Sequence, residues 1–265
     1  MKRFGAWTLC VVLALSLVAC ASSPQPVSAN PSVVSSAPVE ATVSPAPTIA
    51  RSGVTATKYG ESVEGRPLYA RSIGTGPCSV LILASIHGSE PAGTPLLAAL
   101  ERDLLAREPS HLTESVVLVP LVNPDGYAAG KRSNVRGVDL NRNFPADNFR
   151  EARRHGASPL SEPEAVALHQ LILDLKPRLV LSFHQPLNCI DWDGPGESIA
   201  RAMAARCDLP AKRLGSRPGS LGSWVGETLG IPIITIEFKK GEEALGEDGL
   251  WARYGAIFKA VPGLW

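Results

Sequence analysis

Two histidines and two glutamates are the most informative residues of this 265-residue chain, because each of them follows or ends an apolar run. His87 and Glu90 come directly after one such run, His184 closes a second, and Glu237 lies near the end of a third. Two histidines and a carboxylate are the ligand set of a catalytic zinc, which keeps a fourth position open for water. A further carboxylate that is not a ligand can act as the general base. We therefore predict zinc ligands at His87, Glu90 and His184, and a base at Glu237.

The segment 137–144 adds groups that suit an anionic substrate. Asn141 and Arg142 are adjacent, and an amide beside a guanidinium is well suited to binding a carboxylate. Asp139 has two interpretations that the sequence leaves open. It pairs with Arg142 as part of the scaffold, or it accepts a hydrogen bond from a zinc-bound imidazole.

The elements that must position these residues are those of a layered α/β fold, because apolar runs alternate with helical patterns. We predict a mixed, largely parallel central sheet with helices on both faces. Strands are expected at residues 68–73, 79–86, 115–122, 178–183 and 231–238, and helices at 91–107, 161–175 and 250–261. Ser161 to Glu164 has the pattern of a capping box. The candidate residues then fall at carboxyl ends of strands, where open α/β sheets bind ligands.

The N-terminus predicts a lipoprotein. A basic start, a short apolar stretch and a small residue before Cys20 describe a signal peptide over residues 1–19, with lipidation of Cys20. An ordinary secretory signal and a buried N-terminal helix are the alternatives. The Ser-, Pro- and Ala-rich residues 20–55 are expected to be a tether, and residues 56–265 the zinc-binding catalytic domain. By resemblance to Gram-negative lipoproteins, Ala21 after the cysteine implies a periplasm-facing protein anchored in the outer membrane.

Composition bears on the kind of partner that the protein binds and on the state of its cysteines. The formal net charge of +1 does not indicate that the protein binds nucleic acid. Besides Cys10 in the signal and Cys20, the chain has Cys78, Cys189 and Cys207. A bridge between Cys189 and Cys207 and buried free thiols are both compatible with the sequence.

Taken together and in this order, these segments closely resemble the zinc carboxypeptidase (funnelin) family. The resemblance covers residues 58–265, and the Asp-Leu-Asn-Arg-Asn-Phe segment that begins at Asp139 is its most specific part. It implies that the three residues named above hold zinc and that Glu237 activates the water. It also implies that Asn141 and Arg142 bind the terminal carboxylate of the substrate. An arginine upstream would polarise the scissile carbonyl, and Arg132 takes this role in our assignment, with Arg136 as its rival.

Within the family, residues 134–145, 161–164, 184–186 and 217–224 resemble the murein peptide amidase branch. That branch cuts the bond between γ-D-glutamate and meso-diaminopimelate, so the expected partners are peptidoglycan stem peptides. Asp191 and Asp193 are candidates to select the distal amine of diaminopimelate. The stretch just before Glu237 has no tyrosine to cap the substrate, and Trp224 is a candidate for that role.

Two other functions remain open at this stage. The first is a zinc amidohydrolase similar to the aspartoacylase and succinylglutamate desuccinylase branch, which shares the zinc ligands and an Asn-Arg pair. The second is a non-catalytic lipoprotein that binds the cell wall. The non-catalytic function is disfavoured because every catalytic position holds a suitable residue, whereas an inactive copy is expected to have lost at least one.

Overall fold

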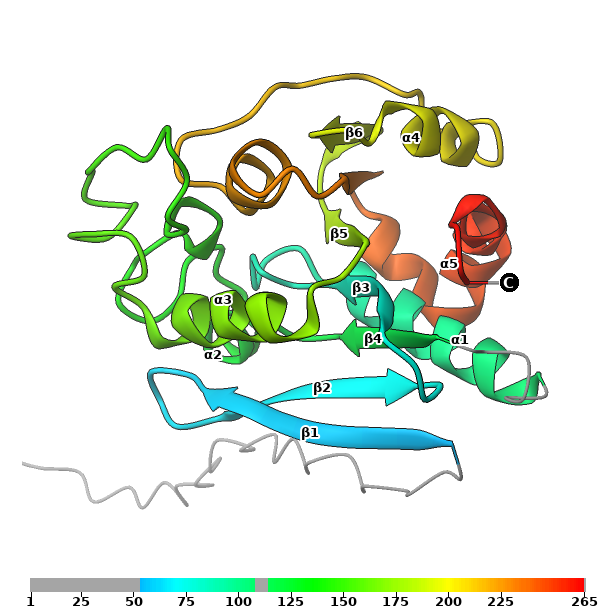
Figure 1. The fold of residues 1–265 in the computed structure, drawn as a ribbon, viewed down its shortest axis with the longest axis horizontal. Helices are drawn as coiled ribbons and strands as arrows, with labels where there is room; N and C mark the ends of the chain where they lie inside the picture. Colours follow the sequence, from blue (N-terminus) through cyan, green and yellow to red (C-terminus); the bar gives the residue numbers. More distant parts are fainter. Residues whose placement is uncertain (1–52, 108–113, 265) are drawn as a thin grey trace, which may run out of the picture. The chain divides into compact units, whose positions relative to one another are not determined.

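A seven-stranded mixed sheet runs through the computed structural model, which describes residues 53–107 and 114–264 (Figure 1). These residues belong to one compact unit, Thr48–Trp265. The expected signal peptide, with Cys20, and nearly all of the expected tether lie outside the described residues. The first strand begins at Val54, slightly before the expected domain boundary.

Four parallel strands form the centre of the sheet, in the order β4-β3-β5-β7. β1 and β2 at one edge, and β6 at the other, are antiparallel to their neighbours. The mixed sheet with a parallel centre is thus confirmed. The strands are β1 Val54–Glu61, β2 Pro67–Ile73, β3 Cys78–Leu83, β4 Ser115–Val119, β5 Leu179–His184, β6 Leu187–Asp193 and β7 Ile233–Lys239.

Sequence analysis missed β1 and β6 because both lack a continuous apolar run. β1 is an edge strand that is largely exposed, so its sequence is mostly polar. β6 buries two aspartates, Asp191 and Asp193, which interrupt the apolar pattern expected of a buried strand.

Two of the three expected helices are present, those at 91–107 and 161–175. The α-helices are α1 Gly93–Ala106, α2 Pro124–Ala128, α3 Pro163–Leu175, α4 Glu197–Ala204 and α5 Gly246–Tyr254. The helix expected at 250–261 is divided between α5 and a 3₁₀ helix, η5 Gly255–Ala260. Shorter turns are η2 Leu140–Arg142, the π-helix η3 Ser223–Thr228 and η4 Glu242–Leu245. No helix among the described residues has the length and hydrophobicity that a bilayer crossing requires.

Helices and loops cover both faces of the sheet, as the apolar central strands predict. One face packs against α1, α4, α5 and η5. The other face packs against α3, η3 and the segment 140–146. Side chains alternate between the two faces, so that Leu81 and Leu83 join the second cluster while Val80 and Ile82 join the first. The second face carries the candidate site.

The predicted capping box of α3 is wrong. Glu162, not Ser161, is the N-cap residue, and it makes no side-chain capping bond. Ser161 instead donates to the Glu162 carboxylate. Glu164 accepts from the backbone N–H of Val63 and from Asn134. Because Asn143 also donates to the Ser161 hydroxyl, long-range contacts occupy both side chains that the local pattern assigned to the helix end.

The described cysteines, Cys78, Cys189 and Cys207, are free thiols, the first two buried. This favours free thiols over a bridge between Cys189 and Cys207.

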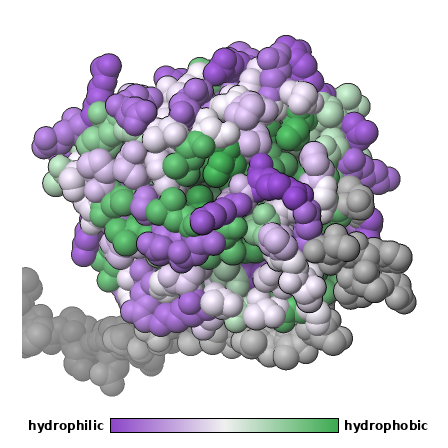
Figure 2. Space-filling model, in the orientation of Figure 1, coloured by the Kyte–Doolittle hydropathy of each residue, from purple (hydrophilic) through white to green (hydrophobic). Residues whose placement is uncertain are grey.

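On the surface seen in Figure 2, hydrophobic residues lie among strongly hydrophilic ones. The exposed large hydrophobic residues come from separate elements, for example Tyr69, Val166, Leu187 and Leu245.

Candidate metal centre and substrate site

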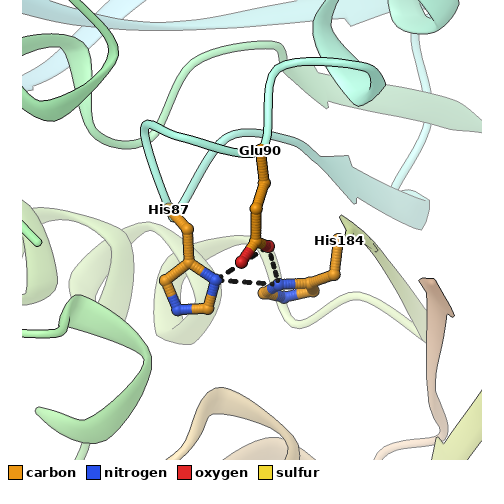
Figure 3. A group of neighbouring side chains, drawn as sticks. All are labelled: His87, Glu90 and His184. Carbon is orange, nitrogen blue, oxygen red and sulfur yellow. Dashed lines mark hydrogen bonds and ion pairs between the residues drawn. The ribbon is translucent and has the colours of Figure 1, made fainter. Parts of the chain in front are cut away.

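Three buried side chains bring one potential ligand atom each to a common point (Figure 3). Glu90 Oε2 lies 2.9 Å from both His87 Nδ1 and His184 Nδ1. The two Nδ1 atoms are 3.1 Å apart. Separations of this size are those that one small tetrahedral cation spans. The structure therefore brings together all three residues that the sequence predicts as zinc ligands.

Asp139 orients the first histidine. His87 Nε2 lies 2.9 Å from Asp139 Oδ1, and a carboxylate there fixes the ring so that Nε2 donates and Nδ1 keeps its lone pair. Burial by itself would lower the pKa of His87, but the hydrogen bonds with Asp139 and Glu90 raise it. The second interpretation of Asp139, as a partner of the ligand imidazole, therefore matches the observed contact.

These donors fit zinc. Nitrogen and carboxylate oxygen are ordinary zinc ligands, and three protein ligands leave a fourth position for water or substrate. The His87 lone pair and the Glu90 oxygen face each other at close range, so they repel unless positive charge lies between them. The chemistry of the donor set is thus that of a catalytic zinc site.

Two glycines allow the loops around this site to approach one another. Gly88 follows His87, and a Cβ added to it would lie 2.0 Å from the carbonyl carbon of Gly126. Only glycine permits such contact between two backbones. Asn123 ties the same loops together, since its amide lies 3.4 Å from the carbonyl oxygens of both Ile86 and Arg132. The Asn-Pro-Asp-Gly segment therefore serves as scaffold.

Arg132 lies at the candidate metal centre and Arg136 does not. Arg132 donates through Nη1 to Glu90 Oε1 at 2.7 Å and through Nε to Asp139 Oδ2 at 3.0 Å. Arg136 lies 3.7 Å from the Glu162 carboxylate instead and is largely exposed. Of the two arginines between which the sequence could not choose, Arg132 is the one that contacts the site.

Asn141 and Arg142 lie on η2, next to the same centre. Asn141 Oδ1 accepts from the backbone N–H of Leu221, and its Nδ2 is 3.5 Å from His184 Nε2. Burial lowers the pKa of Arg142, and the positive charges of Arg132 and Arg217 lower it further. Positive charge thus accumulates beside the metal ligands, as a substrate carboxylate requires.

Glu237 lies on β7, where the sheet register pairs it with His184 on β5 and with Cys189 on β6. It is buried, and its Oε2 accepts from the backbone N–H of Leu187 at 3.2 Å. A glutamate at this position could instead pair with the nearby Lys239 or Lys240, but Lys239 bonds to Asp208.

Trp224 does not cap the substrate site, contrary to the sequence-based assignment. It is 3% exposed and stacks on Phe144 and His169 in the core of the second face. A side chain fixed by two stacked rings cannot close over a ligand. Tryptophan before an active-site strand is as compatible with packing as with binding, and only the tertiary contacts distinguish the two.

Sequence analysis missed the role of Gln185. Its backbone N–H donates to Glu90 Oε2 at 3.2 Å, and its side chain accepts from the N–H of Ala92 at 3.1 Å and donates to Glu243. Gln185 therefore links the loop that carries Glu90 to the strand that carries His184. Its position directly after His184 was the only signal for it in the sequence.

Comparisons with known proteins agree with this geometry. A family model described as zinc carboxypeptidase matches residues 50–190. Murein peptide amidase A of Escherichia coli (strain K12) is 39% identical over 199 residues, which cover 68% of this chain and 79% of the relative. Murein peptide amidase A of Vibrio campbellii is 35% identical over 219 residues, covering 75% and 86%. The crystal structure of murein-tripeptide amidase from Escherichia coli O157 is 36% identical, with a TM-score of 0.62, and the match covers 78% of this chain and 92% of that one.

Proposed function

Because this chain belongs to the zinc carboxypeptidase family, it is a zinc metallopeptidase, and we propose that it hydrolyses the γ-D-glutamyl to meso-diaminopimelate bond of peptidoglycan peptides. The observation that carries the proposal is the convergence of His87, Glu90 and His184 beside the half-buried Arg142. The similarity to murein peptide amidases supplies the class of substrate.

In this proposal His87, Glu90 and His184 hold the metal. Zinc, when bound, supplies a Lewis acid that polarises the scissile carbonyl and lowers the pKa of water. Glu237 takes the proton of the attacking water and passes it to the leaving nitrogen. The register supports this role, because Glu237 lies beside the ligand His184 on a strand about 4.8 Å away.

Arg132 stabilises the negative charge that develops on the carbonyl oxygen. What supports this assignment is its double contact with Glu90 and Asp139, which uses Nη1 and Nε and fixes the plane of the guanidinium. A donor held in place before the reaction needs little reorganisation when charge develops, and this is the main source of electrostatic catalysis.

Asn141 and Arg142 bind the carboxylate of the leaving amino acid. A guanidinium whose pKa is lowered by burial and by neighbouring positive charges gains from an added anion, which offsets both effects. The free carboxylate next to the scissile amide of the wall tripeptide has the required charge and position.

The substrate is tested by incubating the zinc-loaded protein with L-Ala-γ-D-Glu-meso-diaminopimelate and identifying the products by mass spectrometry. We expect release of free diaminopimelate, and release slower by about 10²-fold or more with the matched variant Glu237→Gln. An intact tripeptide together with hydrolysis of N-acyl aspartate or N-acyl glutamate would instead establish the amidohydrolase alternative. An intact tripeptide that still binds would establish the wall-binding alternative.

The location of the enzyme is a separate part of the proposal. We propose that Cys20 is lipidated and anchors the domain at the periplasmic side of the cell envelope, in the outer membrane. The support is the signal-like sequence that ends in Leu17-Val18-Ala19-Cys20. Labelled palmitate should enter the wild-type protein and not Cys20→Ser. Equal labelling of the two proteins would rule out lipidation at this residue.

A further inference from the structure

The segment 217–223 lies directly against the η2 turn, which carries Asn141 and Arg142. The carbonyl oxygen of Gly219 accepts from the backbone N–H of Phe144 at 3.0 Å. A Cβ added to Gly219 would lie 2.4 Å from the carbonyl oxygen of Arg142, and the φ of Gly219 is +64°. Only glycine permits both this conformation and this approach. The backbone of the segment therefore packs on the backbone of the turn.

This packing decides which way the Asn141 amide faces. The backbone N–H of Leu221 donates to Asn141 Oδ1 at 2.8 Å. An N–H can only donate, so the amide oxygen must face Leu221 and the amide nitrogen must face away from it. Asn141 Nδ2 lies 3.5 Å from Nε2 of the metal ligand His184, so it faces the metal centre. A flipped amide would place its NH₂ group against the N–H of Leu221, which is two donors without an acceptor.

A fixed amide makes the recognition of the substrate's terminal group strict. Arg142 is held on the same turn, since its Nη1 donates to the carbonyl oxygen of Asn141, and a guanidinium has donors only. Both side chains therefore offer donors to the terminal group. A carboxylate supplies two acceptor oxygens for them, whereas a carboxamide supplies one oxygen and an NH₂ group that meets a donor. Polar groups left unpaired in this way cost more than a missing hydrogen bond.

Asn148 holds the segment in this position. Its Oδ1 accepts from the backbone N–H of Gly219 at 3.1 Å, and its Nδ2 donates to Ser223 Oγ at 3.1 Å. These two contacts lie on either side of Leu221 along the chain. The partly buried Asn148 side chain thus fixes both ends of the short stretch that presents the Leu221 N–H to Asn141.

Ser223 closes the segment on itself. Its hydroxyl donates to the carbonyl oxygen of Arg217 at 2.6 Å, and its backbone N–H donates to Ser220 Oγ at 3.0 Å. Ser220 and Ser223 are both buried, so water does not replace these bonds easily. The segment therefore moves as a unit, and a displacement at its attachment to Asn148 is passed on to Leu221.

The attachment is separate from the metal ligands. Within the described part of the chain, the side chains of Asn148 and Ser223 bond only to each other and to residues of the segment 217–223. Removing them should therefore leave zinc binding unchanged and act on the orientation of Asn141 alone.

We propose that Asn148 is a positioning residue for substrate recognition. Through the segment 217–223 it holds the Leu221 N–H against Asn141, and it thereby makes the enzyme select a free carboxylate over a carboxamide next to the scissile bond. The inference rests on the proposed function, in which Asn141 and Arg142 bind that carboxylate. Asn148 itself does not touch the substrate.

The test compares two tripeptides that differ in one group. One is L-Ala-γ-D-Glu-meso-diaminopimelate, and in the other the carboxylate next to the scissile amide is a carboxamide. The wild-type enzyme should prefer the first by about 100-fold or more in kcat/KM, since both donors of the site are affected. Asn148→Ala should lower this preference by about 10-fold, through a higher KM for the carboxylate substrate, with kcat and zinc content close to wild type. Ser223→Ala, which keeps the contact between Asn148 and Gly219, should lower it by about 2- to 5-fold.

Ser62→Ala is the matched control for lost stability. Ser62 is buried, donates to Asp125 Oδ1 at 2.8 Å and accepts from the backbone N–H of Arg66 at 3.0 Å. This variant also loses two hydrogen bonds of one side chain, but in the turn between β1 and β2. It should lower Tm about as much as Asn148→Ala and keep the wild-type preference.

The outcomes separate this inference from the proposed function. Asn148→Ala and Ser223→Ala with the wild-type preference would refute the positioning role, and so would an equal fall of kcat/KM on both substrates. Ser223→Ala decides alone if Asn148→Ala folds poorly by circular dichroism. A wild-type enzyme that cuts both tripeptides equally well would refute the selectivity and leave the cleaved bond as proposed. A wild-type enzyme that cuts neither would refute the proposed function, and this inference with it.

Discussion

The candidate site has two sides that differ in how they treat buried carboxylates. Glu90 and Asp139 lie on the metal side, and Asp191 and Asp193 lie on the β6 side, and all four are between 5% and 7% exposed. Burial raises the pKa of each, yet hydrogen bonds with histidines bring the pKa values of Glu90 and Asp139 well below their usual range. Without a cation, burial raises the pKa of Asp191 to about 6 and also raises that of Asp193.

The difference shows that partners, not depth, decide the charge of a buried acid. On the metal side both carboxylates have charged partners within the chain, including Arg132, so the ligands are held in place before substrate arrives. On the β6 side the carboxylates of Asp191 and Asp193 have no cationic partner among the described residues, so a cation from outside the chain is needed to balance their charge. Such groups lower stability and are retained where function requires them. The contrast predicts opposite consequences for removing charge on the two sides.

Loss of a metal ligand is the largest expected effect. His184→Ala and His87→Ala should each lose zinc and with it essentially all activity, while the sheet core keeps the fold with a modest loss of stability. Elemental analysis of the purified variants, with circular dichroism as the control for folding, measures both outcomes. Full zinc content in both variants would disprove the ligand assignment.

Glu237→Gln should keep zinc and substrate binding while kcat falls by about 10²-fold or more, because the amide cannot accept the proton of water. Steady-state kinetics on the tripeptide, at matched zinc content, provide the measurement. Glu237 lies on the β7 strand between the two sides and accepts from a single backbone N–H, so the substitution leaves the paired network intact. A rate within a few-fold of wild type would remove Glu237 from the mechanism.

Asp139→Asn removes one carboxylate from the hydrogen-bonded network of the metal side. Zinc affinity or activity should fall by about 10- to 100-fold, because the amide no longer orients His87. Stability should fall by about 2 kcal/mol at pH 7. The folded-state pKa of Asp139 is lowered, so its contribution is present above the unfolded pKa and is lost as the pH falls through the folded value. Denaturant unfolding of metal-free protein at pH 7 and in acid checks the sign; a more stable variant at pH 7 would contradict it.

Asp191→Asn should have the smallest effect on stability, and with the opposite sign. The folded-state pKa is raised to about 6, so ionisation destabilises the native state as the pH rises from the unfolded value of about 4 to about 6. The variant should therefore be more stable than wild type, by an amount of the order of 1 kcal/mol above pH 6. The gain should vanish below about pH 4. Asp174→Asn on the exposed part of α3 is the control, and equal unfolding curves for wild type and Asp191→Asn at pH 8 would contradict the comparison.

The sequence by itself determined the parallel centre of the fold and the metal ligands. Each ligand follows an apolar strand, and parallel strands bring their carboxyl ends to one edge, so His87, Glu90 and His184 converge once the strands are recognised. Strand periodicity is a local property, and local patterns survive in the sequence whatever the tertiary arrangement.

Only the tertiary structure decided which residues join that site from outside the strands. Arg132 and Arg136 are equivalent in the sequence, and contact with Glu90 separates them. Ser161 has the pattern of a helix cap, but long-range contacts take its partners. The orientation of the Asn141 amide depends on the N–H of Leu221, which is 80 residues away in the chain. These contacts join residues far apart in the chain, and no local pattern encodes which distant group will lie within hydrogen-bond distance.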